Sequence, residues 1–454
     1  MPIGRDLAVA KMEAVGVNPI AISIFTHYWN RLASGATGLI PESTISPLTS
    51  LDSLDDLVET PEDHQALAQT AIIKLNGGLG TSMGLSKAKS LLPVTDGLTF
   101  LDIIVRQVQW TRRRYMVPLP LIFLHSFNTR TDVLAALEAY PDLRVGDLPL
   151  DMMQSEEPKL LRSDLTPVEW PANPHLEWCP PGHGDLYPTM VDSGILDALI
   201  EAGFRYASVA NSDNLGAAPS AGLAGWFART GAPFAAEVTP RTAMDVKGGH
   251  LAVRRRDGRL ILRESAQTSA DEMRYFTDPD IHPYAHCNNL WFDLVALRTK
   301  LDETSGVLEL PLICNQKTVD PSDPSSPEVY QVESAMGAAI ESFEGATAVV
   351  VPRSRFLPVK TTNELTLLRS DVFEMGEDYV LRARVSPLPV VNLAKTYSTI
   401  ANLEQRIPHP LSLTKARTLT ISGDWHFGQN VSIEGDVTLG PQGGLIPDAT
   451  VLSD

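Results

Sequence analysis

From residue 71 onward, short apolar runs alternate with amphipathic stretches along the chain. Segments 71–75, 119–124 and 206–210 are largely apolar and of strand length, whereas segments 101–108 and 189–202 carry apolar side chains at helical spacing. Strands alternating with helices of this length predict βαβ units and a mostly parallel sheet. We therefore expect an α/β fold built on a Rossmann-like, mostly parallel mixed sheet.

The pattern changes on either side of this central part. Residues 1–65 are mixed and mainly helical, with a loop rich in Pro, Ser and Thr near 41–49. Asp257-Gly258 lies between the strand-like segments 250–254 and 259–262, which predicts a hairpin inserted into the sheet. We expect three domains: a mainly helical segment over 1–65, the α/β domain over 66–375 and a third domain over 376–454.

The third domain shows a six-residue period. Its apolar positions are Ile421, Phe427, Ile433, Leu439, Leu445 and Val451, with a second row at Leu419, Trp425, Val431 and Val437. A six-residue period with Gly and Asn at the corners is typical of a parallel β-helix, in which each turn buries its apolar row against the next. A plain β-meander is the alternative. So few turns need a neighbour for stability, so we expect docking on the central domain or on another subunit.

Composition narrows the function classes. The chain has 454 residues, 43% of them hydrophobic and 20% charged, which is typical of a globular protein. Its net charge of −18 argues against nucleic acid and anionic membranes as partners. A phosphate ligand would need a local set of lysines, backbone N–H groups and a metal ion.

Three features favour a cytoplasmic protein. The three cysteines are far apart and in no C-x-x-C spacing, which fits a reducing compartment better than a disulfide framework or a zinc site. No apolar run is long enough to span a bilayer. The first residues lack the basic flank and apolar core of a secretory signal.

A glycine-rich turn follows the predicted strand at 71–75. It reads Asn76-Gly77-Gly78-Leu79-Gly80-Thr81, with Gly84 and Lys89 further on. Glycines let the backbone approach a phosphate and turn its N–H groups inward. The spacing matches neither the Walker pattern nor the usual dinucleotide fingerprint. From these residues alone, a phosphate-binding loop and a structural tight turn are both open.

Seven polar or glycine-containing segments follow one another along the chain: KLNGGLGTSMG, HSFNT, PPGHGDLYPTMVDSGILD, VANSDNLGA, EVTPRTAMDVKGG, CNNLWFDL and VPRSRFLPVKTT. In this order they resemble the motifs of one known family, the eukaryotic-type UTP–glucose-1-phosphate uridylyltransferases (UDP-glucose pyrophosphorylases). The resemblance covers residues 70–454 and implies a GT-A-like nucleotidyltransferase fold closed by a β-helix. The stretch LSKA before Lys89 departs from the family pattern, and Lys87 is an alternative to Lys89.

The resemblance implies a nucleotide site and a metal site. The implied nucleotide contacts are Leu75, Asn76, Gly77, Gly78, Lys89, Gln154, Gly182, Asn211, Ser212, Asp213 and Lys360. Asp213 would hold the metal, and a carboxylate at a strand end suits Mg²⁺. The alternatives are an Asx turn for Asp213 and an ordinary surface position for Gln154.

The resemblance also implies a sugar-phosphate site and two catalytic lysines. His183, Glu237, Lys247 and Asn288, with the neighbouring Asn289, would contact glucose 1-phosphate. Lys89 and Lys360 would neutralise the reacting phosphates. Arg353 and Arg355 lie near Lys360, and we expect this basic cluster to bind an anion rather than form a solvated surface. A structural role is the alternative for His183.

The reaction implied is transfer of UMP from UTP to glucose 1-phosphate with Mg²⁺ as cofactor, giving UDP-glucose and pyrophosphate. Such a transfer depends on alignment and charge neutralisation and needs no general base, because the attacking phosphate is already ionised. The alternatives are another sugar 1-phosphate, such as N-acetylglucosamine or galactose 1-phosphate, and a non-catalytic nucleotide-sugar-binding protein. Association through the β-helix would give a homo-oligomer.

Overall fold

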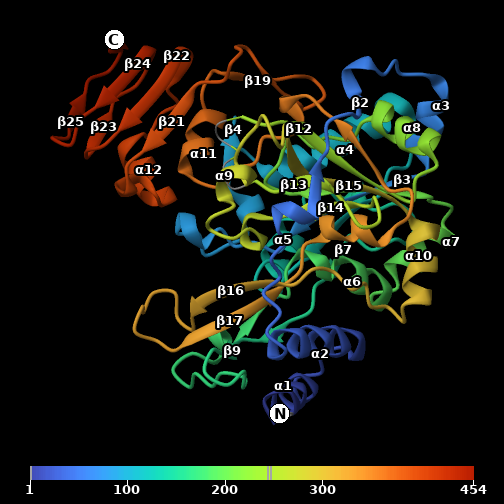
Figure 1. Cartoon of the computed structure of the whole chain (residues 1–454). Coiled ribbons are helices and arrows are strands. Elements are labelled where there is room, and N and C mark those ends of the chain that lie inside the picture. The colour runs from blue at the N-terminus through green and yellow to red at the C-terminus, as the bar shows by residue number, and fades with distance from the viewer. Residues whose placement is uncertain (1–2, 243–244, 246–247, 454) are drawn as a thin grey trace.

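A mixed, mostly parallel sheet forms the centre of the molecule (Figure 1). The computed structural model describes residues 3–242, 245 and 248–453. Only β15 runs antiparallel to both of its neighbours in this sheet, so the predicted α/β class and mostly parallel sheet are confirmed. The strand order is β2 (Asp52–Ser53), β18 (Thr347–Val350), β12 (Phe234–Pro240), β15 (Tyr284–Asp293), β11 (Tyr206–Asn211), β3 (Thr70–Asn76), β6 (Leu121–His125) and β7 (Asp151–Met153).

The two faces of the sheet bury two separate apolar cores. In β3, Ile72 packs into one core while Ala71 and Ile73 pack into the other, as expected when successive side chains alternate across a strand. The first core is covered by α3 (Pro61–Ala68), α4 (Phe100–Tyr115), α8 (Ala221–Thr230) and α11 (Thr362–Leu368). The second is covered by α1 (Ile3–Ala14), α2 (Pro19–Ala33), α6 (Leu186–Asp192), α7 (Ile195–Glu201) and α10 (Leu294–Glu303). A sheet covered on both faces explains why its strands are almost continuously apolar.

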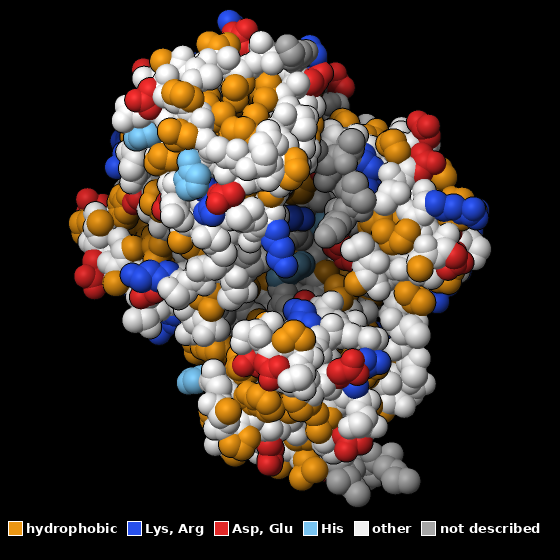
Figure 2. Space-filling view, turned by 90° about the vertical axis from the view of Figure 1, so that its left-hand side faces the viewer, with side chains coloured by type: hydrophobic (Ala, Val, Ile, Leu, Met, Phe, Trp, Pro, Cys, Tyr) orange, Lys and Arg blue, Asp and Glu red, His pale blue; other side chains and the backbone are white. Residues whose placement is uncertain are grey.

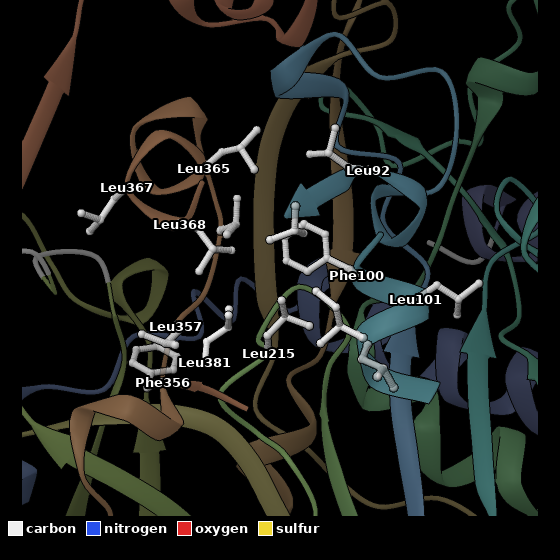
Figure 3. Packing of buried hydrophobic residues seen from close by; sticks show 14 of the residues in the cluster. Leu92, Phe100, Leu101, Leu215, Phe356, Leu357, Leu365, Leu367, Leu368 and Leu381 are labelled. Carbon is white, nitrogen blue, oxygen red and sulfur yellow. The ribbon is translucent and has the colours of Figure 1, made fainter. Parts of the chain in front are cut away.

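Part of the first core connects segments that are far apart in the sequence. Leu215, Leu381, Phe356 and Leu357 are neighbours in the close view, with Phe100 beside them (Figure 3). Leu215 follows β11, whereas Phe356 and Leu357 follow β18. Packing between them therefore fixes two strand-end segments against each other.

The C-terminal part consists of parallel strands. One sheet contains β21 (Val390–Leu393), β22 (Ser412–Ile421), β24 (Ser432–Leu439) and β26 (Val451–Ser453), and a second contains β23 (Trp425–Phe427) and β25 (Gly444–Ile446). Helix α12 (Ile400–Arg406) lies between β21 and β22 in the chain. Apolar residues of these strands belong to the first core of the central sheet, so this part docks on the rest of the chain.

The six-residue period is interrupted near the end. Ile421, Phe427 and Ile433 are buried as predicted, whereas Leu445 is 71% exposed and Val451 is 58% exposed. Phe427 pairs with Ile446 rather than Leu445, because the last repeat contains one additional residue. A shift of one residue exchanges the two faces of a strand, so the expected burial of Leu445 and Val451 was wrong.

The N-terminal segment is helical over α1 and α2 and again where α3 begins, with strands between them. Residues 45–53 supply β1 (Ile45–Pro47) and β2, and β1 pairs with β13 (His250–Arg254) of the predicted hairpin. Strand β14 (Leu260–Arg263) completes it, with Gly258 at φ +71° in the turn. The hairpin forms its own three-stranded sheet with β1 rather than joining the central sheet. The helical pattern at 189–202 divides into α6 and α7, because Gly194 has a left-handed backbone.

Shorter elements complete the fold. They are α5 (Arg130–Leu137), α9 (Met273–Phe276), β4 (Pro93–Thr95), β5 (Leu98–Thr99), β8 (Glu157–Pro158), β9 (Leu160–Leu161), β10 (Trp178–Cys179), β16 (Ile313–Thr318), β17 (Glu328–Glu333), β19 (Phe373–Met375) and β20 (Leu381–Ala383). Across the described ranges, no helix combines the length and apolar character needed to cross a membrane.

Candidate active site

The polar segments singled out in the sequence gather at one edge of the central sheet. The glycine loop follows β3, Gln154 follows β7, Asn211 to Asp213 end β11, and Lys360 lies in the segment after β18. These strands are linked through parallel pairs or through β12 and β15, and ligands of open α/β sheets bind at such strand ends. Figure 2 shows a hollow near the middle of one face, with Lys and Arg side chains on its walls.

The glycine loop lies under Gln154. The Ser126 hydroxyl donates a 2.7 Å hydrogen bond to the Gly77 carbonyl, which ties the loop to the end of β6. A Cβ atom on Gly77 would overlap the Gln154 side-chain oxygen, so glycine is required by this close approach. The structure therefore brings Gly77 and the buried Gln154 into direct contact, as a shared nucleotide pocket requires.

The end of β3 is bonded to the end of β11. The Ser212 N–H donates to the Leu75 carbonyl at 3.0 Å, and the Ser212 hydroxyl donates to Asn76 Oδ1 at 2.9 Å. The Asn76 amide also approaches Nδ1 of the buried His125 at 3.4 Å. These hydrogen bonds hold the ends of β3 and β11 in a fixed position relative to each other.

Lys89 and Asp213 form an ion pair across the cleft. The ammonium lies 2.7 Å from Asp213 Oδ2 and also donates to the Val359 carbonyl. The Lys89 N–H donates to the Gly78 carbonyl at 3.3 Å, and the Val359 N–H donates to the Asp213 carbonyl at 3.3 Å. Three segments that are remote in the sequence therefore meet at Lys89. Lys360 comes directly after Val359, so its backbone lies beside this meeting point.

The two carboxylate oxygens of Asp213 differ in their contacts, because only Oδ2 pairs with Lys89. Its Oδ1 is buried and has no hydrogen-bond partner among the described residues. A cation bound there would gain one protein carboxylate, because no group of three or more His, Cys, Asp or Glu side chains with metal-site geometry occurs in the described part of the chain. Mg²⁺ suits such a site, since it commonly keeps several waters and takes substrate phosphates as its other ligands.

Asn288 occupies an irregularity in β15. In the pairing of β12 with β15, Glu237 lies opposite Asn289 and Val238 lies opposite His286. Two residues of β15, among them Asn288, therefore have no partner in β12. Asn288 has φ +55°, a left-handed backbone that asparagine tolerates better than most residues. Bulges of this kind redirect side chains and are frequent beside active sites.

Only one of the two polar atoms of the Asn288 side chain has a hydrogen-bond partner within the described structure. Its amide donates to Asn211 Oδ1 at 3.1 Å, whereas its own Oδ1 is buried with no partner in the described structure. A buried acceptor without a donor is costly unless a ligand supplies one. Asn288 is therefore suited to accept a hydrogen bond from a ligand hydroxyl.

Glu237 is enclosed by protein groups. Arg355 bonds both of its oxygens at 2.8 and 3.0 Å, Asn289 donates to Oε2 at 3.0 Å, and the Trp291 indole donates to Oε1 at 3.0 Å. Burial alone would raise the pKa of Glu237, but the Arg355 guanidinium and these donors hold it below its usual value. Glu237 is fully buried and so supports Asn289 from behind.

The basic cluster after β18 therefore divides in two. Arg355 pairs with Glu237, and Arg353 pairs with Asp245 at 2.7 Å. The expectation that the whole cluster serves an anion is wrong for these two arginines, because their charges are neutralised inside the protein. Lys360 is exposed, has no ion-pair partner among the described residues and lies near Glu264, whose pKa burial raises and Lys360 lowers.

His183 is held as a neutral imidazole. Its Nδ1 accepts a 2.9 Å hydrogen bond from the Met336 N–H, and burial lowers its pKa to about 4. Since Nδ1 is an acceptor, the ring proton sits on Nε2. Gly182 precedes it at φ +80°, and a Cβ there would meet the Ser334 backbone at 2.6 Å, so only glycine fits.

A family model described as UTP–glucose-1-phosphate uridylyltransferase matches residues 22–434, which is most of the chain. The chain belongs to this family. The family is the one that the sequence motifs resemble, so that identification is confirmed.

Individual relatives agree over nearly the whole length. The UTP–glucose-1-phosphate uridylyltransferase of Hordeum vulgare is 37% identical over 465 residues, covering 99% of this chain and 95% of the relative. That of Saccharomyces cerevisiae is 38% identical over 402 residues, covering 87% and 79%. Among solved structures, a variant of UDP-glucose pyrophosphorylase from Leishmania major in complex with UDP-glucose is 40% identical with a TM-score of 0.94, covering 100% of this chain and 99% of that one.

Two site features were not assigned from the sequence. Asp185 accepts from the Ser155 N–H at 2.7 Å and from its hydroxyl at 2.6 Å, beside Gln154. Burial raises the pKa of Asp185 to about 6, against the lowering effect of these donors. Its place in the PPGHGD motif of the uridylyltransferase family is the signal that could have revealed it. Arg355 is the second feature, and only the fold reveals its partner.

Lys247 lies outside the described residues, so its predicted role stays a prediction. Lys87 is exposed and, unlike Lys89, takes part in no ion pair within the described structure. The geometry thus favours Lys89 of the two lysines.

Replacement of Gly77 by alanine is expected to raise KM for UTP at least tenfold with a smaller change in kcat. The new methyl group would displace Gln154, and misplacement of a binding group costs on the order of 1–3 kcal/mol. Steady-state kinetics with UTP as the varied substrate measures this. Gly222→Ala is the matched control, because a Cβ there makes only ordinary contacts at 3.9 and 4.0 Å and Gly222 lies in α8, outside the proposed nucleotide contacts. Equal KM values for the two variants would contradict the packing argument.

Proposed function

We propose that this chain transfers the uridylyl group of UTP to glucose 1-phosphate, releasing pyrophosphate and forming UDP-glucose. The observation that carries the proposal is the meeting of Lys89, Asp213 and the Lys360 segment at the strand ends, next to the glycine loop. Membership of the uridylyltransferase family supplies the two substrates.

In the proposed reaction, a phosphate oxygen of glucose 1-phosphate attacks the α-phosphorus of UTP. The new P–O bond forms as the bond to the bridging oxygen breaks, and pyrophosphate leaves with that electron pair. No proton has to be removed, because the attacking phosphate is ionised at neutral pH. The neutral His183 fits this scheme, since its Nε2–H can donate to a phosphate oxygen and its Nδ1 is already engaged by Met336.

We assign the cofactor role to Mg²⁺, with Asp213 as its protein ligand. The ion, when bound, neutralises phosphate charge during the transfer. Asp213 Oδ1 is the free acceptor for it. Lys89 would neutralise the leaving pyrophosphate, and Lys360 would stabilise charge on the reacting phosphates.

The nucleotide and sugar contacts follow the same geometry. The proposed uracil and ribose contacts are Leu75, Asn76, Gly77, Gly78, Gln154, Gly182, Asn211 and Ser212. Asn288 would accept from a sugar hydroxyl, and Lys247 stays a proposed contact to the sugar phosphate. Glu237 is proposed as a positioning residue that orients Asn289, since it is fully buried behind it.

The cysteines and the exposed C-terminal residues bear on location and assembly. All three cysteines lie in the described part and are free, which supports the cytoplasm as the site of action. We propose that the C-terminal strands are a short parallel β-helix, and the exposed Leu445 and Val451 at its end support association with another copy.

Assay of the purified chain with UTP and a panel of sugar 1-phosphates tests the reaction. We expect magnesium-dependent pyrophosphate release, with glucose 1-phosphate giving the highest kcat/KM. A higher value for galactose or N-acetylglucosamine 1-phosphate would favour the second candidate, a uridylyltransferase for another sugar. Ligand binding without pyrophosphate release would instead identify a non-catalytic nucleotide-sugar-binding protein.

A further inference from the structure

A cavity lies beside the turn of the β13–β14 hairpin. It is open on one side, has a volume of about 1040 Å³ and is lined by Arg31, residues between 37 and 44, the hairpin, the end of α10 with the segment up to Pro311, and residues 341–342. We call it the hairpin cavity. Lys89, Asp213 and Lys360 are not among its lining residues. Its size is near the upper end of small-molecule sites, about 300–1000 Å³.

The lining of the hairpin cavity is basic. Six cationic side chains line it, against two lining carboxylates, Glu309 and Glu341. Two more carboxylates pair with these cations from outside the lining, Asp257 with Arg254 and Glu303 with Lys300, which leaves an excess of two positive charges. The whole chain carries −18. Concentrating like charges costs Coulomb energy unless an anion offsets it. The cations are Arg31, Arg254, Arg255, Arg256, Arg259 and Lys300.

Some of these cations hold the cavity together. Arg254 bonds Asp257 at 2.8 Å and Glu341 at 2.6 Å, which fixes the hairpin turn against the segment that follows Ile340. Arg259 donates to the Glu341 carbonyl at 3.1 Å. The Arg255 N–H donates to the Thr44 carbonyl at 2.9 Å, which joins the hairpin to the segment after α2. The walls of the cavity are therefore fixed by hydrogen bonds.

Other cations remain available. Within the described residues, no ion pair engages Arg31 or Arg255, and Arg256 reaches Asp257 only at 3.6 Å. Arg255 and Arg256 are exposed. Guanidinium groups match phosphate oxygens in paired, charge-assisted hydrogen bonds. Three such groups on fixed walls suit a ligand with several phosphates.

We propose that the hairpin cavity binds a multiply phosphorylated small molecule, at a site separate from the uridylyl-transfer cleft. A small ligand is favoured over a nucleic-acid strand because the whole chain carries a net charge of −18. A polymer extending beyond the cavity would meet a predominantly acidic protein.

Isothermal titration of the full chain with sodium tripolyphosphate in EDTA tests the proposal. We expect a binding event that Arg255→Gln/Arg256→Gln weakens at least about tenfold. The matched control is Arg113→Gln/Arg114→Gln, an adjacent pair of exposed arginines at the end of α4 with the same charge change. The control pair should stay within about twofold of the unmodified chain, as is usual for surface substitutions.

A second variant separates the two sites. Lys89→Ala/Lys360→Ala removes the cleft cations and should leave the hairpin-cavity event intact, whether or not the chain proves to be a uridylyltransferase. Loss of the event in this variant, or an equal loss in the control pair, would overturn the proposal. Arg255- and Arg256-dependent binding of a single-stranded oligonucleotide, tighter than that of tripolyphosphate, would also overturn it.

Discussion

Replacement of Asp213 by asparagine is expected to lower kcat for uridylyl transfer by about 10²–10³-fold. Asparagine keeps the size of the side chain but removes the charge that pairs with Lys89 at 2.7 Å and that is proposed to bind a cation at Oδ1. Because asparagine has nearly the same size and shape and the backbone of residue 213 already bonds Val359, the fold should survive. The measurement is kcat at saturating UTP and glucose 1-phosphate.

Measuring the rate at increasing Mg²⁺ concentration distinguishes loss of the metal site from loss of the fold. The variant should need a much higher Mg²⁺ concentration for half-maximal rate, whereas loss of the fold would lower the amplitude without shifting the midpoint. Asp96→Asn is the matched control, since Asp96 is an exposed aspartate in the turn between β4 and β5 and loses the same charge. Near-normal turnover with an unchanged magnesium midpoint would remove Asp213 from the metal site.

The sequence was sufficient for features that depend on local pattern. The alternation of apolar runs predicted the sheet, and Asp257-Gly258 predicted the hairpin that β13 and β14 form. The sequence placed the glycine loop and the Asp213 segment at the ends of two predicted strands. Because ligands of open α/β sheets bind at the carboxyl ends of the strands, both segments were expected to lie at one site. What joined them to one reaction was the family resemblance rather than spacing.

Long-range pairing is what the sequence could not provide. Lys89 and Asp213 are separated by 124 positions, and Arg355 lies 118 positions from Glu237. A single sequence displays these charges without their partners, so Arg353 and Arg355 resembled an anion site although buried carboxylates neutralise them. The same limit applies to Asn288, whose position depends on a register shift between β12 and β15.

The end of the C-terminal repeat shows a different limit. A strict six-residue period predicts that Leu445 faces inward, but Ile446 takes that place against Phe427. One additional residue in a loop changes which face every later side chain occupies. Periodicity therefore predicts the buried positions of the earlier strands well and those of the last strands poorly, because the sequence does not show which loop contains the additional residue.

Replacement of Lys360 by alanine is expected to reduce kcat by about 10²–10³-fold, which corresponds to about 2–4 kcal/mol of lost transition-state stabilisation. Within the basic cluster, Arg353 and Arg355 form ion pairs with Asp245 and Glu237. Lys360 has no ion-pair partner among the described residues. It also follows Val359, whose backbone contacts both Lys89 and Asp213. Its ammonium can therefore reach charge that develops on the phosphates.

Lys87→Ala is the control that distinguishes a specific contact of Lys360 from a general effect of losing one positive charge. Lys87 is exposed, close to Lys89 in the sequence and carries the same charge, so a diffuse electrostatic effect would slow both variants similarly. We expect Lys87→Ala to retain kcat within about twofold and Lys360→Arg to recover part of the loss, since the charge returns with a different geometry. Unfolding curves should coincide for all three proteins, because neither lysine is buried. If Lys360→Ala turned over like Lys87→Ala, the reacting phosphates would have to be neutralised by Lys89 and the metal site alone.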